Sequence, residues 1–265
     1  MQSEQVNTDV RHNVTVNLLD GAFFGLGLGI SSYTTILPLF IALMTDSAML
    51  VGLVAAMHAI GWQFPQLFTS GLVSRQRRYK PAVVLLTSIE RLPYFALALL
   101  ALALPVLSNN VALILTFPVI VLLAFGGGFT ATAWQSMLGK IIPPRILGRF
   151  YGAQSATANL LLSVGAVIAG FILGENPQHT DFALCFMLSG IFMCVSWVFI
   201  ALSRETPHEP LEKQKRNSGE FRAKIMQMLN QDSNLRWFMV ARVLALFAQT
   251  AIGFYAIYGA KQLGA

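Results

Sequence analysis

Charged residues inside long apolar segments are the best candidates for chemistry in this 265-residue sequence. Glu90 and Arg91 lie about nine residues into the apolar segment 82–107, roughly 13 Å along a helix. A charge at that depth in a membrane needs a partner or a water-filled cavity. A carboxylate there can carry a proton or pair with a solute, or the two residues can belong to a structural charge network. Adjacent helical residues point about 100° apart, so the two need not pair with each other.

Two further titratable residues lie in the first two apolar segments. His58 lies in segment 49–72, where it is either a proton carrier or a hydrogen-bonded packing residue. Asp20 lies about one turn inside segment 17–43. At a helix N-terminus its carboxylate can bind free backbone N–H groups or pair with loop cations. A role in proton coupling is the alternative for Asp20.

The sequence carries none of the patterns expected of a soluble enzyme. Gly126–Gly128 lie in the middle of an apolar segment, and no glycine-rich loop with a lysine follows a strand pattern. No cysteine and histidine residues have the spacing of metal ligands. The sequence therefore predicts no enzyme, no cofactor and no metal site.

Composition places the chain in a membrane. Hydrophobic residues make up 55% of the sequence and charged residues only 11%, whereas soluble domains carry roughly a quarter charged residues. The apolar segments each exceed the ~20 residues that cross a bilayer, and in lipid such segments must be helical. They span residues 17–43, 49–72, 82–107, 111–138, 150–173, 182–203 and 237–260. We therefore expect an all-α transmembrane protein with about seven helices, preceded by a polar tail over residues 1–16.

The loop charges predict the orientation. The turn Gly71–Pro81 is rich in arginine and lysine, and Lys140–Arg149 forms a second basic turn. The alternate turns carry acidic residues such as Asp46 and Glu175 instead. Because positive charges stay on the cytoplasmic side, we expect a cytoplasmic N-terminus in a multi-pass protein of the plasma membrane. Cations confined to short loops form no single basic face, which argues against nucleic acid as a partner.

The segments also predict a division into parts. Residues 1–203 form a six-helix transmembrane bundle, residues 204–236 a basic cytoplasmic linker, and residues 237–265 the first helix of an incomplete second bundle. The first and fourth segments both contain a glycine cluster, at Gly25–Gly29 and at Gly126–Gly128. Glycine at such positions is typical of closely packed membrane helices.

At this point the chain resembles the major facilitator superfamily of secondary transporters. In the turn after the second segment, Gly71 and Lys80 match the family's loop motif in register, while Arg75 stands where the family has an aspartate. The turn Pro143–Arg149 is similar to the family's proline-rich turn with a Gly-Arg pair, here Gly148 and Arg149. The layout of six helices, basic linker and further helix is the third point of resemblance. Without the aspartate, the loop is expected to use other acidic partners, such as Asp20 or a second bundle.

The resemblance implies a fold of two bundles that rock around a central site. It implies transport of a small solute across the lipid bilayer, driven by an ion gradient, with the proton as the expected ion. This chain resembles the first bundle plus one helix, so we expect a partial sequence whose C-terminal bundle is missing. Two alternatives stay open: a seven-helix receptor or sensor, and an intramembrane enzyme that uses Glu90 and His58. The predicted orientation and the absence of a lysine in mid-helix seven count against a photoreceptor.

The resemblance also selects candidate residues. Polar residues on the helices that line the family's cavity are expected to contact the solute: Tyr33, Thr34, Thr35, Gln63, Gln66, Trp134, Gln135, Asn159, Gln249 and Tyr255. They predict a mostly neutral cavity and a neutral, amphipathic or weakly polar solute. The charged candidates for proton coupling or structure are Asp20, His58, Glu90 and Arg91. The candidates for the conformational loop are Gly71, Arg75, Arg77, Arg78, Lys80, Gly148 and Arg149.

Overall fold

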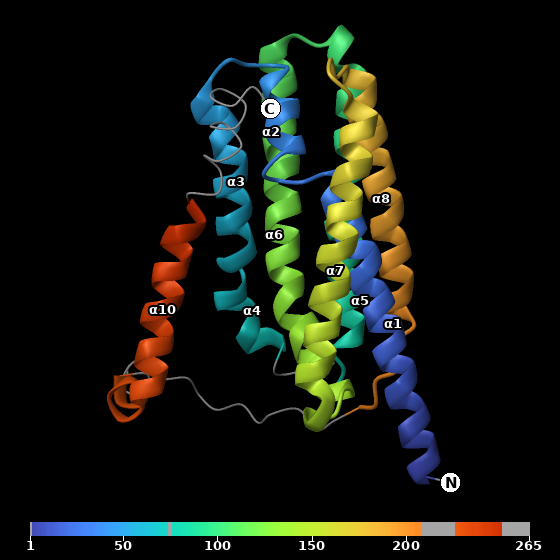
Figure 1. Ribbon diagram of the computed structural model, residues 1–265, viewed down its shortest axis with the longest axis vertical. Helices are drawn as coiled ribbons and strands as arrows, with labels where there is room; N and C mark the ends of the chain where they lie inside the picture. Colours follow the sequence, from blue (N-terminus) through green and yellow to red (C-terminus); the bar gives the residue numbers. More distant parts are fainter. Residues whose placement is uncertain (1, 74–75, 208–225, 251–265) are drawn as a thin grey trace. The chain divides into compact units, whose positions relative to one another are not determined.

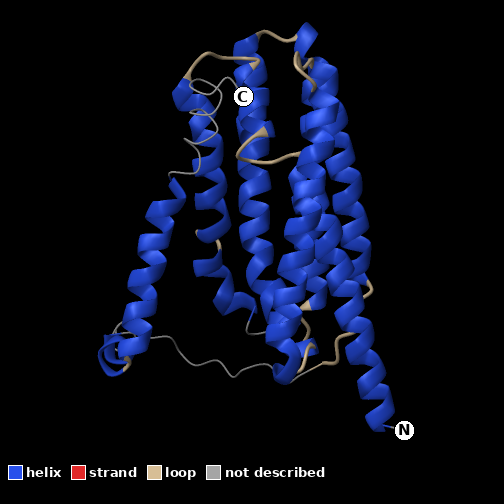
Figure 2. Cartoon of the chain, viewed as in Figure 1, coloured by secondary structure: helices blue, strands red, loops and turns tan. Residues whose placement is uncertain are grey.

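The computed structural model describes residues 2–73, 76–207 and 226–250. In these ranges helices are joined by turns and loops, and there is no strand (Figure 2). The chain forms two compact units, Met1–Pro210 and Leu211–Ala265. The first unit contains helices α1 to α8, and the second contains α10 (Ser233–Thr250). The predicted boundaries at residues 203 and 236 stay predictions.

Helix α1 (Gln2–Ile30) begins much earlier than predicted. The expected polar tail over residues 1–16 is therefore wrong, because its side chains have partners in the bundle. Asn17 is buried and donates to the Ser203 hydroxyl at 3.0 Å. Asn13 donates to the backbone carbonyl of Arg204 at 2.9 Å. These bonds join the first helix to the chain that follows the sixth predicted segment.

Two of the predicted helices are broken. Segment 17–43 divides into α1 and α2 (Ile36–Ala42), at a point where the Ser31 hydroxyl bonds the Gly27 carbonyl at 3.2 Å. Side-chain hydroxyls of this kind compete with the helical hydrogen-bond pattern. Segment 49–72 divides into α3 (Ala48–Gln63) and α4 (Gln66–Val73), because Pro65 has no backbone N–H and its ring crowds the preceding turn.

The other predicted segments of the first unit form single long helices. These are α5 (Lys80–Ala103), continued by the short helix η1 (Leu104–Val106), then α6 (Asn109–Ile141), α7 (Pro144–Leu173) and α8 (His179–Ala201). Five described helices are long and apolar enough to cross a membrane: those over Asp9–Ile30, Lys80–Val106, Asn109–Ile141, Pro144–Leu173 and His179–Ala201. The all-α transmembrane class is confirmed.

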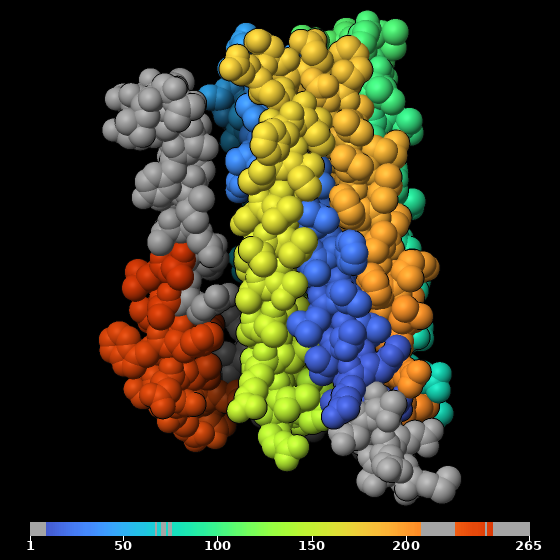
Figure 3. Space-filling model, turned by 45° about the vertical axis from the view of Figure 1, so that its right-hand side comes forward, coloured from blue at the N-terminus to red at the C-terminus, as the bar shows by residue number. Residues whose placement is uncertain are grey.

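Helix α1 organises the packing of the bundle. It lies between α7 and α8, as Figures 1 and 3 show, while α5 packs against α6 and α8, and α3 packs against α6. Glycines make the closest approach possible. A Cβ atom at Gly25 would overlap the carbonyl oxygen of Ala158, and one at Gly29 would overlap that of Leu162. On α7, a Cβ atom at Gly165 would in turn overlap the carbonyl oxygen of Leu26 on α1. Small residues thus let the backbones of α1 and α7 touch.

At one end of the bundle, a buried carboxylate links three loops. Glu205, just after α8, has a fully buried side chain and accepts hydrogen bonds from the backbone N–H groups of Tyr79 at 2.9 Å and Lys80 at 2.7 Å. It also forms an ion pair with Lys140, at the end of α6, at 2.7 Å. Burial, and then the negative charge of Glu205, raises the pKa of the Tyr79 phenol above its usual value. Glu205 is thus an acidic partner of the turn Gly71–Pro81. The sequence had suggested Asp20 or a second bundle for this role.

We expect Glu205→Gln to loosen this end of the bundle. The amide keeps the shape but loses the charge that binds two N–H groups at the start of α5 and the ammonium of Lys140. Hydrogen bonds to charged groups are worth about 1.5–3 kcal/mol each, so a loss of about 1–3 kcal/mol is expected. The measurements are the thermal midpoint in detergent and the rate of tryptic cleavage after Arg78. Glu175→Gln, at an exposed carboxylate, is the matched control, and an equal midpoint and cleavage rate in the two variants would contradict the assignment.

Candidate functional site

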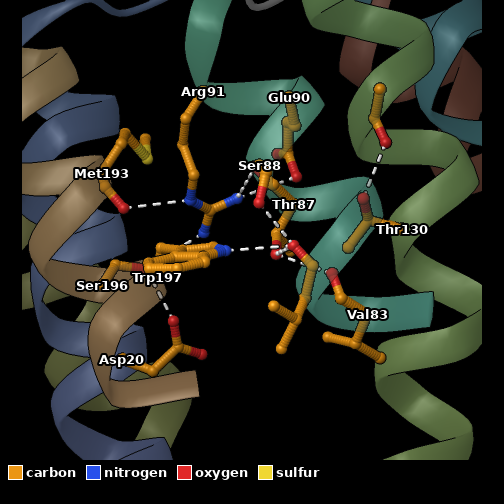
Figure 4. A network of polar contacts seen from close by, with 12 residues as sticks. Asp20, Val83, Thr87, Ser88, Glu90, Arg91, Thr130, Met193, Ser196 and Trp197 are labelled. Atoms are coloured by element: carbon orange, nitrogen blue, oxygen red, sulfur yellow. Dashed lines mark hydrogen bonds and ion pairs between the residues drawn. The ribbon is translucent and has the colours of Figure 1, made fainter. Parts of the chain in front are cut away.

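The centre of the first unit holds a connected set of charged side chains. The Arg91 guanidinium lies 3.1 Å from Glu90 Oε2 and donates to the Ser196 hydroxyl at 3.2 Å. That hydroxyl in turn donates to Asp20 Oδ1 at 2.6 Å. Figure 4 shows the chain of contacts running from α5 through α8 to α1. All four residues are buried, so in this part of the molecule two carboxylates share one guanidinium and one hydroxyl.

Arg91 is held in place by backbone atoms as well as by side chains. Its Nε donates to the carbonyl of Met193 at 3.0 Å and its Nη1 to that of Thr87 at 3.1 Å. The guanidinium carbon lies 5.9 Å from the ring centroid of Phe24. Glu90 does pair with Arg91, although neighbouring helical residues need not, because the long arginine side chain reaches back along α5. The two chemical groups therefore act as one ion pair.

Glycines on α6 make room for Glu90. A Cβ atom at Gly126 would lie 3.2 Å from Glu90 Cα, and one at Gly127 would lie 3.4 Å from Glu90 Oε1. The same Gly127 position is 2.9 Å from the Trp62 ring. The glycine cluster of the fourth segment thus has a specific purpose: it lets α5, α6 and the Trp62 side chain meet around a carboxylate.

Asp20 is not at a helix N-terminus. Because α1 begins at Gln2, Asp20 lies about 27 Å along the helix at 1.5 Å per residue. The expectation that its carboxylate binds free N–H groups at the first turn is therefore wrong. Its partner is Ser196 on α8, and the side chain of Trp134 on α6 also interacts with it.

A cavity of about 450 Å³ opens beside these groups. Helices α1, α3, α5, α6, α7 and α8 all contribute to its wall. The lining residues are Asp20, Gly21, Phe24, Trp62, Thr87, Glu90, Arg91, Gly127, Thr130, Ala131, Trp134, Gln154, Ser155, Ala158, Asn159 and Ile200. Most of this wall is apolar, with the charged set at one side. Such a pocket, mainly apolar with a few convergent polar groups, is typical of a small-molecule site.

The structure brings some of the predicted residues to this cavity and places others elsewhere. The predicted residues that line it are Asp20, Glu90, Arg91, Trp134 and Asn159. Thr34, Thr35, Gln63 and Gln135 are exposed away from it, and Gln66 donates to the Trp62 carbonyl at 2.6 Å. The side chain of Gln249 and all of Tyr255 lie outside the described residues.

Tyr33 and His58 form a separate contact. Their rings stack with centroids 3.6 Å apart, and Tyr33 is buried in the core that includes Phe40 and Tyr94. Neither Tyr33 nor His58 lines the cavity of about 450 Å³. Their geometry favours packing over proton transfer to that cavity.

The loop candidates lie at the end of the bundle that holds Glu205. Arg77 and Arg78 are exposed, and the carbonyl of Arg77 accepts a hydrogen bond from Lys140 at 3.4 Å. Gly71 lies within α4 and Lys80 begins α5, while Arg75 lies outside the described residues. Gly148 and Arg149 are exposed in the first turns of α7.

Several residues of the site were missed by the sequence reasoning. Ser196 connects Arg91 to Asp20, yet a serine in an apolar segment gives no signal of its own. Gln154 did carry a signal, because it is an amide in the same apolar segment as Asn159. It is buried and donates to the backbone carbonyl of Asn17 at 3.1 Å.

A family model described as Major Facilitator Superfamily matches residues 91–264, which is more than half of the chain. No match was found among curated proteins. The matched region begins at Arg91 and includes α6, α7 and α8, which form much of the cavity wall. The chain therefore belongs to the major facilitator superfamily, and it is a membrane transporter of that kind with an all-α bundle fold.

Proposed function

We propose that the protein is a secondary active transporter that moves a small solute through the plasma membrane by alternating access. The observation that carries this proposal is the cavity of about 450 Å³ lined by Asp20, Glu90 and Arg91. Charged groups inside a membrane are costly and mark solute or ion pathways when they face a cavity. A charge network with only a structural role needs no open space beside it.

The same residues are the proposed site of proton coupling. A proton bound by Glu90 would remove the negative charge that holds Arg91 at 3.1 Å. Arg91 would then keep its bonds to the Met193 and Thr87 carbonyls and to Ser196 on α8, which links it to Asp20 on α1. Protonation thereby connects the charge state of the cavity to the contacts among three helices, which is what coupling requires.

The proposed arrangement of the whole transporter follows the family. Residues 1–203 act as one bundle with a cytoplasmic N-terminus, residues 204–236 as a cytoplasmic linker, and residues 237–265 as the start of a second bundle. The two bundles would move relative to each other around the solute. The partners of this chain are then the lipid bilayer, the solute and the second bundle.

Alternating access is tested most directly by labelling a residue of the cavity wall from the two sides of the membrane. We expect Asn159→Cys, in a full chain with Cys185→Ser and Cys194→Ser, to react with a membrane-impermeant maleimide in intact cells and in inverted vesicles. Glu175→Cys and Arg77→Cys, at opposite ends of the bundle, should each react from one side only. Reaction of Asn159→Cys from a single side would contradict the proposal.

The same assay tests coupling. An imposed pH gradient should shift the ratio of labelling from the two sides for Asn159→Cys. Addition of Glu90→Gln, which cannot ionise, should abolish that shift while leaving two-sided labelling in place. A shift that persists unchanged would exclude Glu90 as the coupling group.

A further inference from the structure

Most hydrogen-bond donors of the cavity wall already have partners within the protein. Thr87 donates to the Val83 carbonyl at 2.6 Å and Thr130 to the Gly126 carbonyl at 2.9 Å. The two amides of the wall, on Gln154 and Asn159, donate to backbone carbonyls at 3.1 and 2.8 Å. The Arg91 guanidinium, described above, donates to two carbonyls, a hydroxyl and a carboxylate. A solute that mainly accepts hydrogen bonds would compete with these partners for the donors named, and the remaining donors of the wall are the Ser155 hydroxyl, the Trp62 indole and the second N–H of each amide.

The acceptors of the cavity keep unused capacity. An ionised carboxylate offers about four acceptor sites. Glu90 accepts from Arg91 through Oε2, and the side chain of Thr130 also interacts with this carboxylate. Asp20 accepts from Ser196 through Oδ1 and interacts with Trp134. The carbonyl oxygens of the amide side chains can accept as well. The two carboxylates thus keep acceptor sites that a solute with hydrogen-bond donors would complement.

The net charge of the cavity and its aromatic side chains also favour a solute that donates hydrogen bonds. Two carboxylates and one guanidinium give the cavity a formal charge of −1 when all three are ionised. The rings of Phe24, Trp62 and Trp134 form part of the wall, and aromatic rings attract cations through their faces. The Arg91 guanidinium already lies over the Phe24 ring, so the two tryptophans are the rings left for a solute. A cationic head group therefore has acceptors, charge and aromatic faces available within one cavity.

We propose that the transported solute is an organic cation, with a protonated amine or similar N–H-bearing head and an apolar body. This inference rests on the proposed transport function and specifies the chemistry of its solute. The sequence predicted a neutral, amphipathic or weakly polar solute; the proposed solute is amphipathic but charged, because the sequence did not place Asp20, Glu90 and Arg91 in the cavity. The head group binds at Glu90 and Asp20, and the apolar body lies against the aromatic wall.

The test compares three probes of similar size and different charge. Binding of 2-phenylethylammonium, 2-phenylethanol and phenylacetate to the purified full chain at neutral pH is followed by titration calorimetry. We expect the cation to bind at least about tenfold more tightly than either of the other probes, which corresponds to about 1.4 kcal/mol. Equal or tighter binding of the alcohol or the carboxylate would overturn the proposal, and so would no binding of any probe.

Variants locate the binding site. Glu90→Gln and Asp20→Asn should each weaken binding of the cation about tenfold or more and leave binding of the alcohol little changed, whereas Glu175→Gln should have no effect on either. Glu90→Asp, which keeps the charge, should restore most of the preference if the fold tolerates it. The preference among probes in the unaltered protein tests the proposal even if a variant fails to fold. Two-sided labelling of Asn159→Cys without preference for the cation would refute the solute class and leave the transport function standing.

Discussion

Arg91→Ala is expected to be among the most damaging substitutions in the bundle interior. It removes every bond of the guanidinium and leaves Glu90 without its buried partner. Breaking a buried ion pair from one side costs about 3–5 kcal/mol, since an uncompensated charge is left behind. We expect a decrease of this size in the free energy of unfolding, measured by denaturant titration in detergent, together with reduced yield of folded protein.

A double substitution separates the charge effect from lost packing. Arg91→Met with Glu90→Gln removes both charges and keeps most of the side-chain volume, so it should be less destabilising than Arg91→Ala alone. Arg78→Ala, at an exposed cation, should change stability by less than about 0.5 kcal/mol. If Arg91→Ala cost no more than Arg78→Ala, the guanidinium could not be the centre of the buried network.

The second large effect is expected at the contact between α1 and α7. Gly25→Ala and Gly29→Ala would each place a Cβ atom against a backbone carbonyl of α7, at Ala158 or Leu162. Backbone atoms cannot rotate away as a side chain can, so the helices must separate. Overpacking of this kind costs about 1–3 kcal/mol or more. The measurement is the thermal midpoint and the free energy of unfolding in detergent.

Substitution of glycine by alanine on α7, away from its contact with α1, provides the control. Gly152 and Gly170 are helical, and a Cβ atom at either would meet nothing within 4 Å. Gly152→Ala and Gly170→Ala should therefore be neutral or stabilising by up to about 1 kcal/mol, because alanine favours the helix. Opposite signs for the two pairs are the expected result. A similar stabilisation at all four positions would show that α1 and α7 are not in backbone contact.

Helix formation and membrane insertion follow from the sequence because both depend on local composition. A segment of more than ~20 apolar residues must satisfy its backbone internally in lipid, whatever its neighbours are. The glycine clusters at Gly25–Gly29 and Gly126–Gly128 were interpreted as typical of closely packed helices, because small residues favour close contact in membrane helices, and both clusters lie at such contacts. The family resemblance, which rested on loops and layout, is confirmed by the match over residues 91–264.

The start of the first helix depends on tertiary contacts. Residues 1–16, which include Asn13, predict a polar tail when only their neighbours in sequence are considered, and Asn17 was expected to begin the first apolar segment. Ser203 and Arg204, which are distant in sequence, supply the hydrogen-bond partners of these two asparagines. That contact extends α1 by several turns, and it moves Asp20 from the expected helix end into the interior.

The sequence by itself determined that helices form, that they cross a membrane, and that Glu90 and Arg91 need partners at their depth. Only the tertiary structure decided which polar residues share a cavity. Neighbours on a helix point about 100° apart, so Trp134 faces the cavity while Gln135 is exposed, and no local pattern distinguishes them. Ser196 joins Arg91 to Asp20 because α8 lies between α5 and α1. That arrangement comes from helix packing, and it is what turns isolated charges into one site.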